Sequence, residues 1–235
     1  MSALLTGPGA IKDRAIDGQP VVAIGARSGL WYTNIVSRWA DAMESIELSS
    51  FPTADPRDLC DAEELRAMAD DFPEGGFAGF NGDEMVAMGI GIRTHFDLDN
   101  PHHTVHDIVD VDGNVSGHVT DGPWYYGITI AVRSDHRRRG IGRELYELRK
   151  TVCRDLDLNG IVAGGVMPGY ADHLDSMSAD DYIASVRAGE LYDPTLSFQA
   201  ANGFELGPAL AGYITDPAVN NYSALIVWHN PGQRD

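Results

Sequence analysis

Residues 128–142 read ITIAVRSDHRRRGIG, a dense apolar stretch that runs into a basic loop with two glycines. From Ile141 to Leu156, apolar residues recur at helical spacing, so the pattern predicts a strand, a loop and an amphipathic helix in succession. The free N–H groups and the dipole at the start of such a helix favour an anion. Gly140 and Gly142 would let the backbone approach a phosphate closely. The stretch therefore predicts a phosphate cradle.

The charge of this loop separates it from the rest of the chain. Its arginines stand in an acidic protein of 235 residues whose formal net charge is −18. The loop is not a Walker A motif, because no Gly-Lys-Ser/Thr follows, and it lacks the three glycines of a dinucleotide fingerprint. The pyrophosphate of another nucleotide-like cofactor remains as the predicted ligand.

The remaining chain predicts an α/β fold with a mixed sheet. A hairpin signal at Asn81-Gly82-Asp83-Glu84 separates two short strands, and Asp61 with Glu64 forms a capping-box pattern that starts a helix ending at Phe72-Pro73. Predicted strands are 19–25, 77–80, 85–92, 125–132, 160–166, 212–213 and 223–228. Predicted helices are 33–49, 61–72, 141–156, 177–188 and 194–201.

The chain shows no internal repeat and no linker between two cores. We expect a flexible leader over 1–18 and a single domain over 19–235, with insertions near 95–122 and 167–191. The first insertion has a small hairpin signal around Asp112-Gly113. Cys60 and Cys153 fall in predicted helices, where we expect them to be small core residues rather than a disulfide or metal pair.

The composition of the chain argues against some classes of binding partner. No window approaches 18 uninterrupted apolar residues and the N-terminus lacks a secretory layout, so we expect no membrane span and a cytoplasmic protein. The net charge of −18 argues against nucleic acid. It would attract a cationic substrate, but the excess of Asp over Glu and the presence of only two lysines resemble adaptation to high salt or genome composition. We favour that second explanation.

The stretch Arg137–Gly142 matches the Arg/Gln-x-x-Gly-x-Gly/Ala element of GNAT acetyltransferases, which binds the pyrophosphate of coenzyme A. Asn202-Gly203-Phe204 resembles the Gly-Phe that follows the fourth helix of that family. The chain therefore resembles the GNAT-type N-acyltransferases, and the resemblance covers roughly residues 30 to 230. The GNAT domains fused to carbon–nitrogen hydrolases are similar in a further set of short segments. These segments are 72–75, 126–127, 164–165, 168–170, 189–191, 193–199 and 228–231.

The resemblance implies a GNAT-like fold, a mostly antiparallel sheet whose fourth and fifth strands splay apart. Ile130, Ala131 and Val132 would hold the pantetheine arm of acetyl-CoA or another acyl-CoA. A small-molecule amine would attack the thioester directly in a ternary complex, and a strand N–H would stabilise the oxyanion. The residues implied at the pyrophosphate are Arg137, Arg138, Arg139, Gly140, Ile141, Gly142 and Arg143.

The sequence indicates the proton-transfer residues less clearly than it indicates the cofactor-binding residues. Gln199 stands where the family often has a tyrosine that protonates the CoA thiolate, and an amide cannot serve as that acid. We predict Tyr170 as its substitute, ahead of Tyr192 and Tyr222, and His173, ahead of His118, as general base. No metal site is predicted, because His102, His103 and His106 lie on a loop and we expect them to be solvated.

Two other functions stay open. The missing tyrosine is compatible with a non-catalytic acyl-CoA-binding or sensor domain, and the fused relatives suggest an accessory partner of an amidohydrolase. The two insertions would crowd a peptide groove, so we expect a small-molecule acceptor rather than a protein lysine. The identity of the acceptor, the acyl chain length and the choice between monomer and homodimer are left open.

Overall fold

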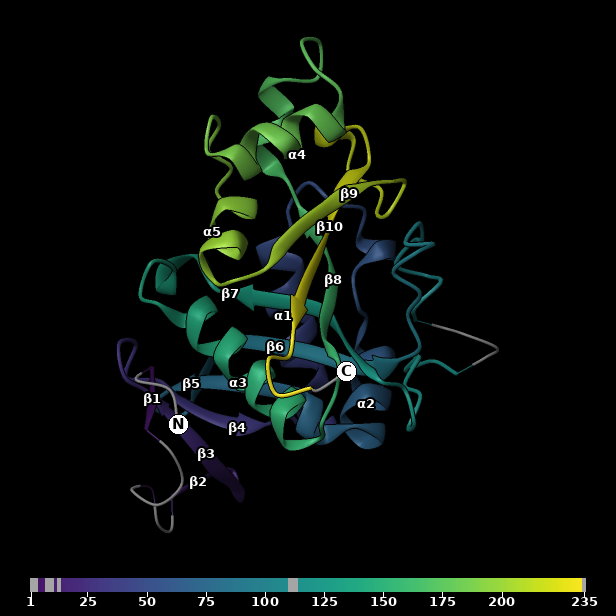
Figure 1. The fold of residues 1–235 in the computed structure, drawn as a ribbon. Helices are drawn as coiled ribbons and strands as arrows, with labels where there is room; N and C mark the ends of the chain where they lie inside the picture. Colours follow the sequence, from purple (N-terminus) through teal and green to yellow (C-terminus); the bar gives the residue numbers. More distant parts are fainter. Residues whose placement is uncertain (1–3, 7–10, 12–13, 110–113, 234–235) are drawn as a thin grey trace.

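The computed structural model describes residues 4–6, 11, 14–109 and 114–233 (Figure 1). Its main helices are α1 Ala40–Ser50, α2 Ala62–Asp71, α3 Ile141–Asp155, α4 Ala179–Ala188 and α5 Leu196–Ala201. Its strands are β1 Leu5–Thr6, β2 Ala15–Ile16, β3 Gln19–Gly25, β4 Trp31–Asn34, β5 Gly76–Asn81, β6 Glu84–Thr94, β7 Trp124–Val132, β8 Gly160–Val166, β9 Glu205–Ala211 and β10 Tyr222–His229.

One continuous sheet runs through the described chain in the order β1-β3-β4-β5-β6-β7-β8-β10-β9, with β2 beside β3. Every pairing is antiparallel except that of β7 with β8. These two parallel strands pair only at Tyr125↔Ile161 and Tyr126↔Val162. Beyond Tyr126 no further residue pairs join β7 to β8, so the two strands diverge there. The fold is thus a mixed α/β sheet of the GNAT-like kind, as predicted.

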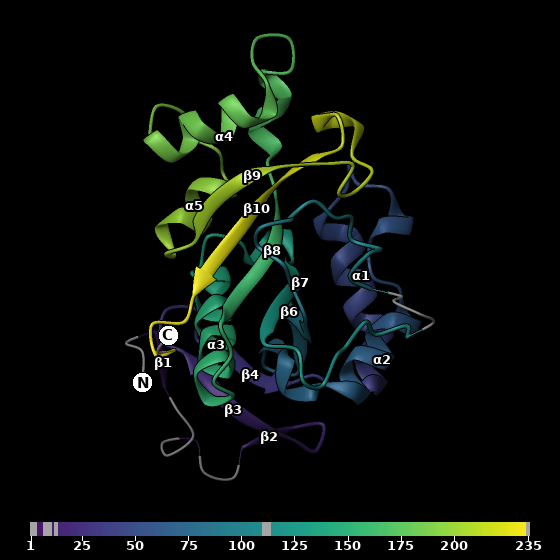
Figure 2. The ribbon, with the colours of Figure 1, turned by 45° about the vertical axis from the view of Figure 1, so that its right-hand side comes forward.

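The sheet has an apolar core on each face, because side chains alternate across a strand. Tyr125 belongs to the core under α3, α4 and α5, while its neighbour Tyr126 belongs to the core under α1 and α2. Figure 2 shows α1 and α2 on one side of the central strands and α3 on the other. The gap between β7 and β8 therefore opens between two helical layers.

Several local predictions are confirmed. Asp61 caps α2 with its side chain on the Glu63 and Glu64 amides, and Glu64 reaches back to the Asp61 N–H to complete the capping box. Gly82 takes a φ of +64° in the turn between β5 and β6. Ser178 caps α4. Strands β3 and β8 have the predicted bounds.

The predicted helix 33–49 is wrong in its first part. Trp31–Asn34 forms β4, which pairs with β3 and β5, and a short 3₁₀ turn at Ser37–Trp39 precedes α1. Apolar residues keep helical spacing from α1 back to Ile35, but this pattern does not produce a helix there. The aromatic and β-branched side chains at 31–33 fit a central strand better. The predicted strand 212–213 is also wrong. The strand in this region is β9, which ends at Ala211, and Gly212 lies in the turn that follows, with a φ of +69°.

Other differences concern the ends and loops. The described parts of segment 1–18 include β1 and β2, which pair with β3 instead of forming a detached leader. Cys60 lies in the loop before α2 rather than in a helix, although both it and Cys153 are buried free thiols as expected. The hairpin signal at Asp112-Gly113 lies outside the described residues. Among the described residues, no helix is both long enough and apolar enough to cross a bilayer.

Candidate active site

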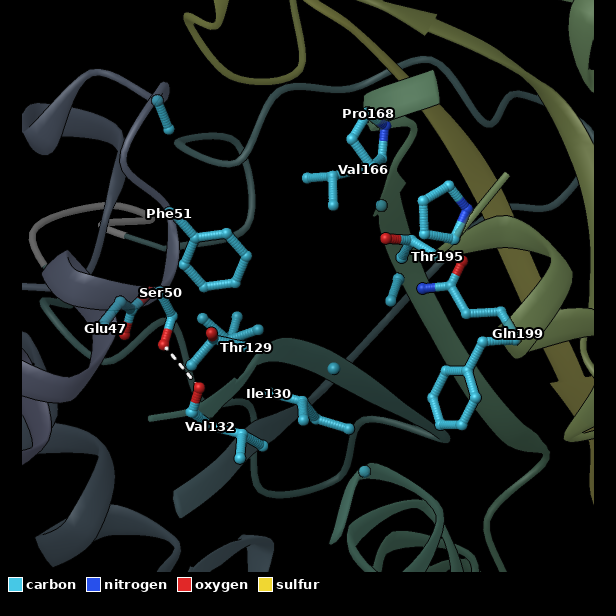
Figure 3. Close-up of a pocket in the computed structure, with 18 of the residues that line it drawn as sticks. Glu47, Ser50, Phe51, Thr129, Ile130, Val132, Val166, Pro168, Thr195 and Gln199 are labelled. Atoms are coloured by element: carbon cyan, nitrogen blue, oxygen red, sulfur yellow. Dashed lines mark hydrogen bonds between the residues drawn. The ribbon is translucent and has the colours of Figure 1, made fainter. Parts of the chain in front are cut away.

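A cavity of about 790 Å³ opens where β7 and β8 diverge. Its walls come from the end of α1 and the following segment 50–60, from both strands, from the loop and first turns of α3, and from α5. In Figure 3, Glu47, Ser50 and Phe51 face Gln199, Thr195 and Pro168 across the opening, and Thr129, Ile130 and Val132 of β7 lie between them. The cavity therefore connects the α1 layer to the α3 layer through the gap in the sheet.

The predicted phosphate cradle forms one end of this cavity. Helix α3 begins at Ile141, and its N-cap Gly140 has a φ of +89° and provides no side-chain cap. The first helical amides have no intrahelical acceptors, so they are available to an anion. Arg137 fixes the loop by donating from Nε to the Val132 carbonyl (3.0 Å) and from its terminal nitrogen to the Ser50 carbonyl (3.3 Å).

The orientation of α3 is set by Glu144, which is fully buried one turn into the helix. Its carboxylate accepts hydrogen bonds from the Arg27 and Ser28 amides at 3.0 Å each and from the Tyr32 hydroxyl at 2.7 Å. A charged acceptor with this many donors makes strong bonds. Glu144 thus ties the start of α3 to the β3–β4 turn and holds the phosphate cradle in place.

Strand β7 carries an irregularity at the centre of the cavity. The register shifts between Ile90 and Gly91 of β6, so Ile128 on β7 has no direct partner. Buried Arg149 of α3 donates to the Ile90 carbonyl at 2.6 Å and to the Thr129 carbonyl, which stabilises the bulge. Bulges commonly re-aim backbone and side chains next to active sites.

Most of the predicted cofactor residues line the cavity. They are Ile130, Val132, Arg137, Arg138, Gly140, Ile141, Gly142 and Arg143. Ala131 and Arg139 are not among the lining residues. Ala131 is buried in the core under α1, since adjacent strand residues point to opposite faces.

The other end of the cavity holds a buried carboxyl group that the sequence prediction missed. Glu47 of α1 is 2% exposed and lines the cavity, and burial raises the pKa of its carboxyl to about 8. The Cys60 backbone and the nearby Thr129 hydroxyl oppose that shift, but neither Glu47 Oε2 nor Thr129 Oγ1 makes a hydrogen bond of normal length. A buried acid with unused hydrogen-bonding capacity in a cavity is a candidate for proton transfer.

A second missed group is Tyr146 of α3, which also lines the cavity. Its hydroxyl accepts a hydrogen bond from Gln199 Nε2 at 3.2 Å, which leaves its own hydrogen free to donate. Burial raises the pKa of the Tyr146 hydroxyl, so it remains protonated at neutral pH. Gln199 Oε1 is buried without a partner. The Gln199 amide therefore holds the Tyr146 hydroxyl at the cavity.

The structure does not bring the predicted proton-transfer residues into this cavity. Tyr170 is 4% exposed, and its hydroxyl donates to the Met177 carbonyl at 3.1 Å. His173 packs against the Tyr182 ring, with centroids 5.3 Å apart. Tyr170 and His173 are both absent from the lining residues, whereas Tyr192 lines the cavity but is 77% exposed. The catalytic roles of Tyr170 and His173 stay predictions.

Two of the three loop histidines are exposed as expected, namely His102 and His106, and His106 pairs with Asp58 at 2.9 Å. His103 differs, because it is half-buried among aromatic rings. The candidate base His118 stacks on Phe72 with ring centroids 4.8 Å apart. Within the described residues no group of three or more potential ligands could hold a metal.

Signals for the two missed residues are present in the sequence. Glu47 follows Met43 by four positions, so it continues the apolar stripe of the predicted helix, where an acid is unusual. Tyr146 follows Gly142 by four positions and so lies above the phosphate cradle on the same helix face. Neither signal identifies a cavity without the tertiary packing of β7.

Comparisons with known proteins identify a matching family and two relatives of the chain. A family model described as acetyltransferase (GNAT) family matches residues 40–171. The "Probable hydrolase YhcX" of Bacillus subtilis is 36% identical over 199 residues, which is 84% of this chain, and the chain spans only 38% of the length of YhcX. The "Uncharacterized N-acetyltransferase YkwB" of the same organism is 28% identical over 79% of this chain and 82% of its own length.

Solved structures share the fold at low identity. The loading GNATL domain of CurA from Lyngbya majuscula has a TM-score of 0.72 and 18% identity, over 86% of this chain and 98% of its own. The GphF GNAT-like decarboxylase in complex with isobutyryl-CoA has a TM-score of 0.67 and 17% identity, over 85% and 98%. The structure described as "yncA, a putative ACETYLTRANSFERASE from Salmonella typhimurium with its cofactor Acetyl-CoA" has a TM-score of 0.53 and 12% identity, over 88% and 96%. These structures share the fold, and the family model, which matches more than half of the chain, shows that the chain belongs to the acetyltransferase (GNAT) family.

Proposed function

We propose that this protein transfers an acyl group, with acetyl as the default, from acyl-CoA to a small-molecule amine in a ternary complex. The observation that carries the proposal is the single cavity that joins an uncapped, arginine-flanked helix start to a buried carboxyl group through the gap between β7 and β8. Such a cavity can hold an anionic donor at one end and an amine at the other.

The residues present fit coenzyme A. A pyrophosphate would occupy the amides of Ile141, Gly142 and Arg143, with the nearby arginines as counter-charges. The pantetheine arm would lie along Ile130 and Val132 in the gap. Solved relatives of the same fold hold acetyl-CoA and isobutyryl-CoA, which supports a donor of this class.

Two cavity residues supply the proton transfers in this proposal. Glu47 accepts a proton from the incoming ammonium, and the cation beside it favours the ionised carboxylate that burial otherwise disfavours. The amine nitrogen then attacks the thioester carbonyl, the C–N bond forms and the C–S bond breaks. Tyr146, oriented by Gln199, donates a proton to the departing thiolate and recovers one from the amide nitrogen.

The acceptor end supports a cationic substrate. Glu47, Asp58 and Asp216 line this end, whereas Arg137, Arg138 and Arg143 lie at the cofactor end. The two aspartates already accept protein hydrogen bonds, Asp58 from His106 and Asp216 from Thr53. Glu47 is therefore the group left to meet the amine directly.

The experiment is an assay of CoA release from acetyl-CoA with a panel of small amines, run beside calorimetric binding of acetyl-CoA. We expect turnover with at least one amine, and loss of turnover without loss of acetyl-CoA binding in Glu47→Gln. Tight binding without turnover across the panel would favour the sensor function instead.

The same assay separates the competing catalytic assignments. If Tyr170 and His173 act as predicted from the sequence, Tyr170→Phe and His173→Ala will lose turnover. Retained turnover in both variants, with loss in Glu47→Gln, would assign proton transfer to the cavity residues.

A further inference from the structure

A chain of three polar side chains leads from the acceptor end of the cavity towards the surface. Tyr213 lines the cavity, and its hydroxyl oxygen lies 3.0 Å from that of Tyr126. The Tyr126 hydroxyl in turn lies 2.5 Å from His103 Nε2. His103 is partly exposed on the loop after β6, and its Nδ1 lies 2.7 Å from the Pro101 carbonyl. These contacts connect the acceptor end of the cavity to the surface of the loop after β6.

The inner end of this chain occupies the apex of the gap between the strands. A side chain at Gly164 of β8 would collide with the Tyr213 ring, because a Cβ there would lie 2.3 Å from two ring carbons. Gly164 is the second residue beyond Val162, which forms the last β7–β8 pair. Its N–H faces the Tyr126 and Tyr213 hydroxyls and opposes the rise in their pKa. The absent side chain thus lets the hydroxyl pair reach the cavity.

The hydrogens of this chain have two consistent arrangements, since each hydroxyl carries only one. The Pro101 carbonyl can only accept, so His103 Nδ1 carries a hydrogen. With neutral His103, Tyr126 donates to His103 Nε2, and Tyr213 donates to Tyr126; the opposite direction, from Tyr126 to Tyr213, belongs to the second arrangement. With cationic His103, Nε2 donates to Tyr126, Tyr126 donates to Tyr213, and the Tyr213 hydrogen points elsewhere, towards the cavity. Moving one proton along the chain converts one arrangement into the other.

We propose that Tyr213, Tyr126 and His103 form a relay that carries the proton released at the acceptor end of the cavity out to solvent. This inference rests on the proposed function, in which an ammonium and acyl-CoA give an amide, the CoA thiol and one proton. The proton reaches Tyr213 from Glu47 while the Tyr213 hydrogen passes to Tyr126 and the Tyr126 hydrogen passes to His103 Nε2. His103 then gives one proton to solvent when its partly exposed ring turns away from the Pro101 carbonyl, and its return as the neutral Nδ1–H tautomer restores the first arrangement. Glu47 and Tyr213 both line the cavity, so the group that releases the proton and the first member of the relay face the same space.

The electrostatic surroundings suit each member to this role. Burial lowers the pKa of His103, with Asp107 opposing and His102 reinforcing that shift, so its imidazole is neutral and ready to accept at pH 7. Burial raises the pKa of Tyr213 to about 12 and that of Tyr126 well above its ordinary value. Both phenols therefore stay protonated and pass protons without becoming phenolates. The Phe96 ring covers His103 from a third side and adds no charge.

The first test does not need turnover. Nitrogen NMR of histidine-labelled protein, assigned with His103→Gln, should show His103 as the neutral Nδ1–H tautomer at pH 7.5, with Nε2 accepting a hydrogen bond. Tyr126→Phe should remove that hydrogen bond and leave the ring packed. A cationic His103 or an Nε2–H tautomer at this pH would overturn the relay, whether or not the proposed acyl transfer is found.

The second test measures proton exit. In Tyr126→Phe we expect kcat to fall by about tenfold and then to rise with the concentration of imidazole buffer, which replaces the relay. The matched control is Tyr125→Phe, which removes an equally buried hydroxyl of the same strand that bonds the Gly75 carbonyl on the other face. If Tyr126→Phe matched Tyr125→Phe in kcat and neither responded to buffer, the chain would be structural. Absence of turnover in the wild type would instead count against the proposed function, and the NMR result would still decide the relay.

Discussion

The two ends of the cavity are built in opposite ways. The cofactor end is one continuous segment, in which Arg137 to Arg143 form the loop and the first turn of α3. The acceptor end is assembled from Glu47 on α1, Thr129 on β7 and Tyr213 beyond β9. The first end has basic side chains and free amides, and the second has a buried acid and the unpaired hydroxyl of Thr129.

This difference explains why the two ends are unequally visible in a sequence. A phosphate site at a helix start needs only local geometry, so spacing and residue type reveal it. A proton-transfer site depends on burial, which raises the Glu47 pKa only because β7 and segment 50–60 close over α1. The predictions below test this contrast between a local and an assembled site.

The largest effect is expected at the local end. In Gly140→Asp, affinity for acetyl-CoA should fall by roughly a hundredfold or more, because the substitution places a negative charge at the anion site and a side chain at a φ of +89°. A Cβ at this position would also lie 2.8 Å from Cδ of Arg27. Calorimetric titration with acetyl-CoA measures the loss.

Gly189→Asp is the matched control for this substitution. Gly189 ends α4 with a φ of +76°, and a Cβ there would meet nothing within 4 Å. The substitution Gly189→Asp imposes the same kind of backbone penalty and adds the same charge, but away from the cavity. Equal acetyl-CoA affinity in both variants would show that the loop before α3 is structural.

The next effect is expected at the assembled end. In Glu47→Gln, kcat/KM for the amine should fall by about 10²–10⁴, the usual contribution of a positioned acid or base. The wild-type kcat/KM should rise as pH increases through about 8, because only the ionised carboxylate of the free protein accepts a proton. The variant should lack that rise.

The pH profile of Glu44→Gln provides the comparison, since Glu44 lies one turn earlier on the same helix and is only partly buried. It should keep the wild-type profile. If Glu47→Gln kept both the rate and the pH dependence, the base would have to be sought elsewhere, with His173 the first alternative.

Sequence patterns predicted the elements whose signals are local. The Asp61 capping box, the turn at Gly82 and the bounds of β8 depend on residues within a few positions of one another. Strand β4 was missed because its conformation is imposed by pairing with β3 and β5 on either side. The assembled end was missed for the same reason, since nothing near Glu47 in the sequence shows that β7 covers it.

A smaller loss is expected from Tyr146→Phe. Removing the hydroxyl that would protonate the CoA thiolate should lower kcat by about 10-fold to 100-fold while leaving acetyl-CoA affinity nearly unchanged. Gln199→Leu should show a similar but weaker effect, because the amide orients the hydroxyl through a 3.2 Å hydrogen bond. Steady-state kinetics with calorimetric binding separate the two quantities, and an unchanged kcat in both variants would exclude this pair from proton transfer.

The smallest effect, and one of opposite sign, is expected at Thr129. Its hydroxyl is buried on β7 without a hydrogen bond of normal length, and a valine of similar shape would remove that unsatisfied group. Thr129→Val should therefore stabilise the free protein by about 1 kcal/mol in chemical denaturation. The same change should raise the pKa of Glu47 further, because the nearby hydroxyl now favours the carboxylate, and should move the rise of kcat/KM to higher pH. A destabilised variant with an unshifted profile would mean that Thr129 serves packing alone, whereas greater stability with a shifted profile would show that the assembled end sacrifices stability to keep a base in reach of its substrate.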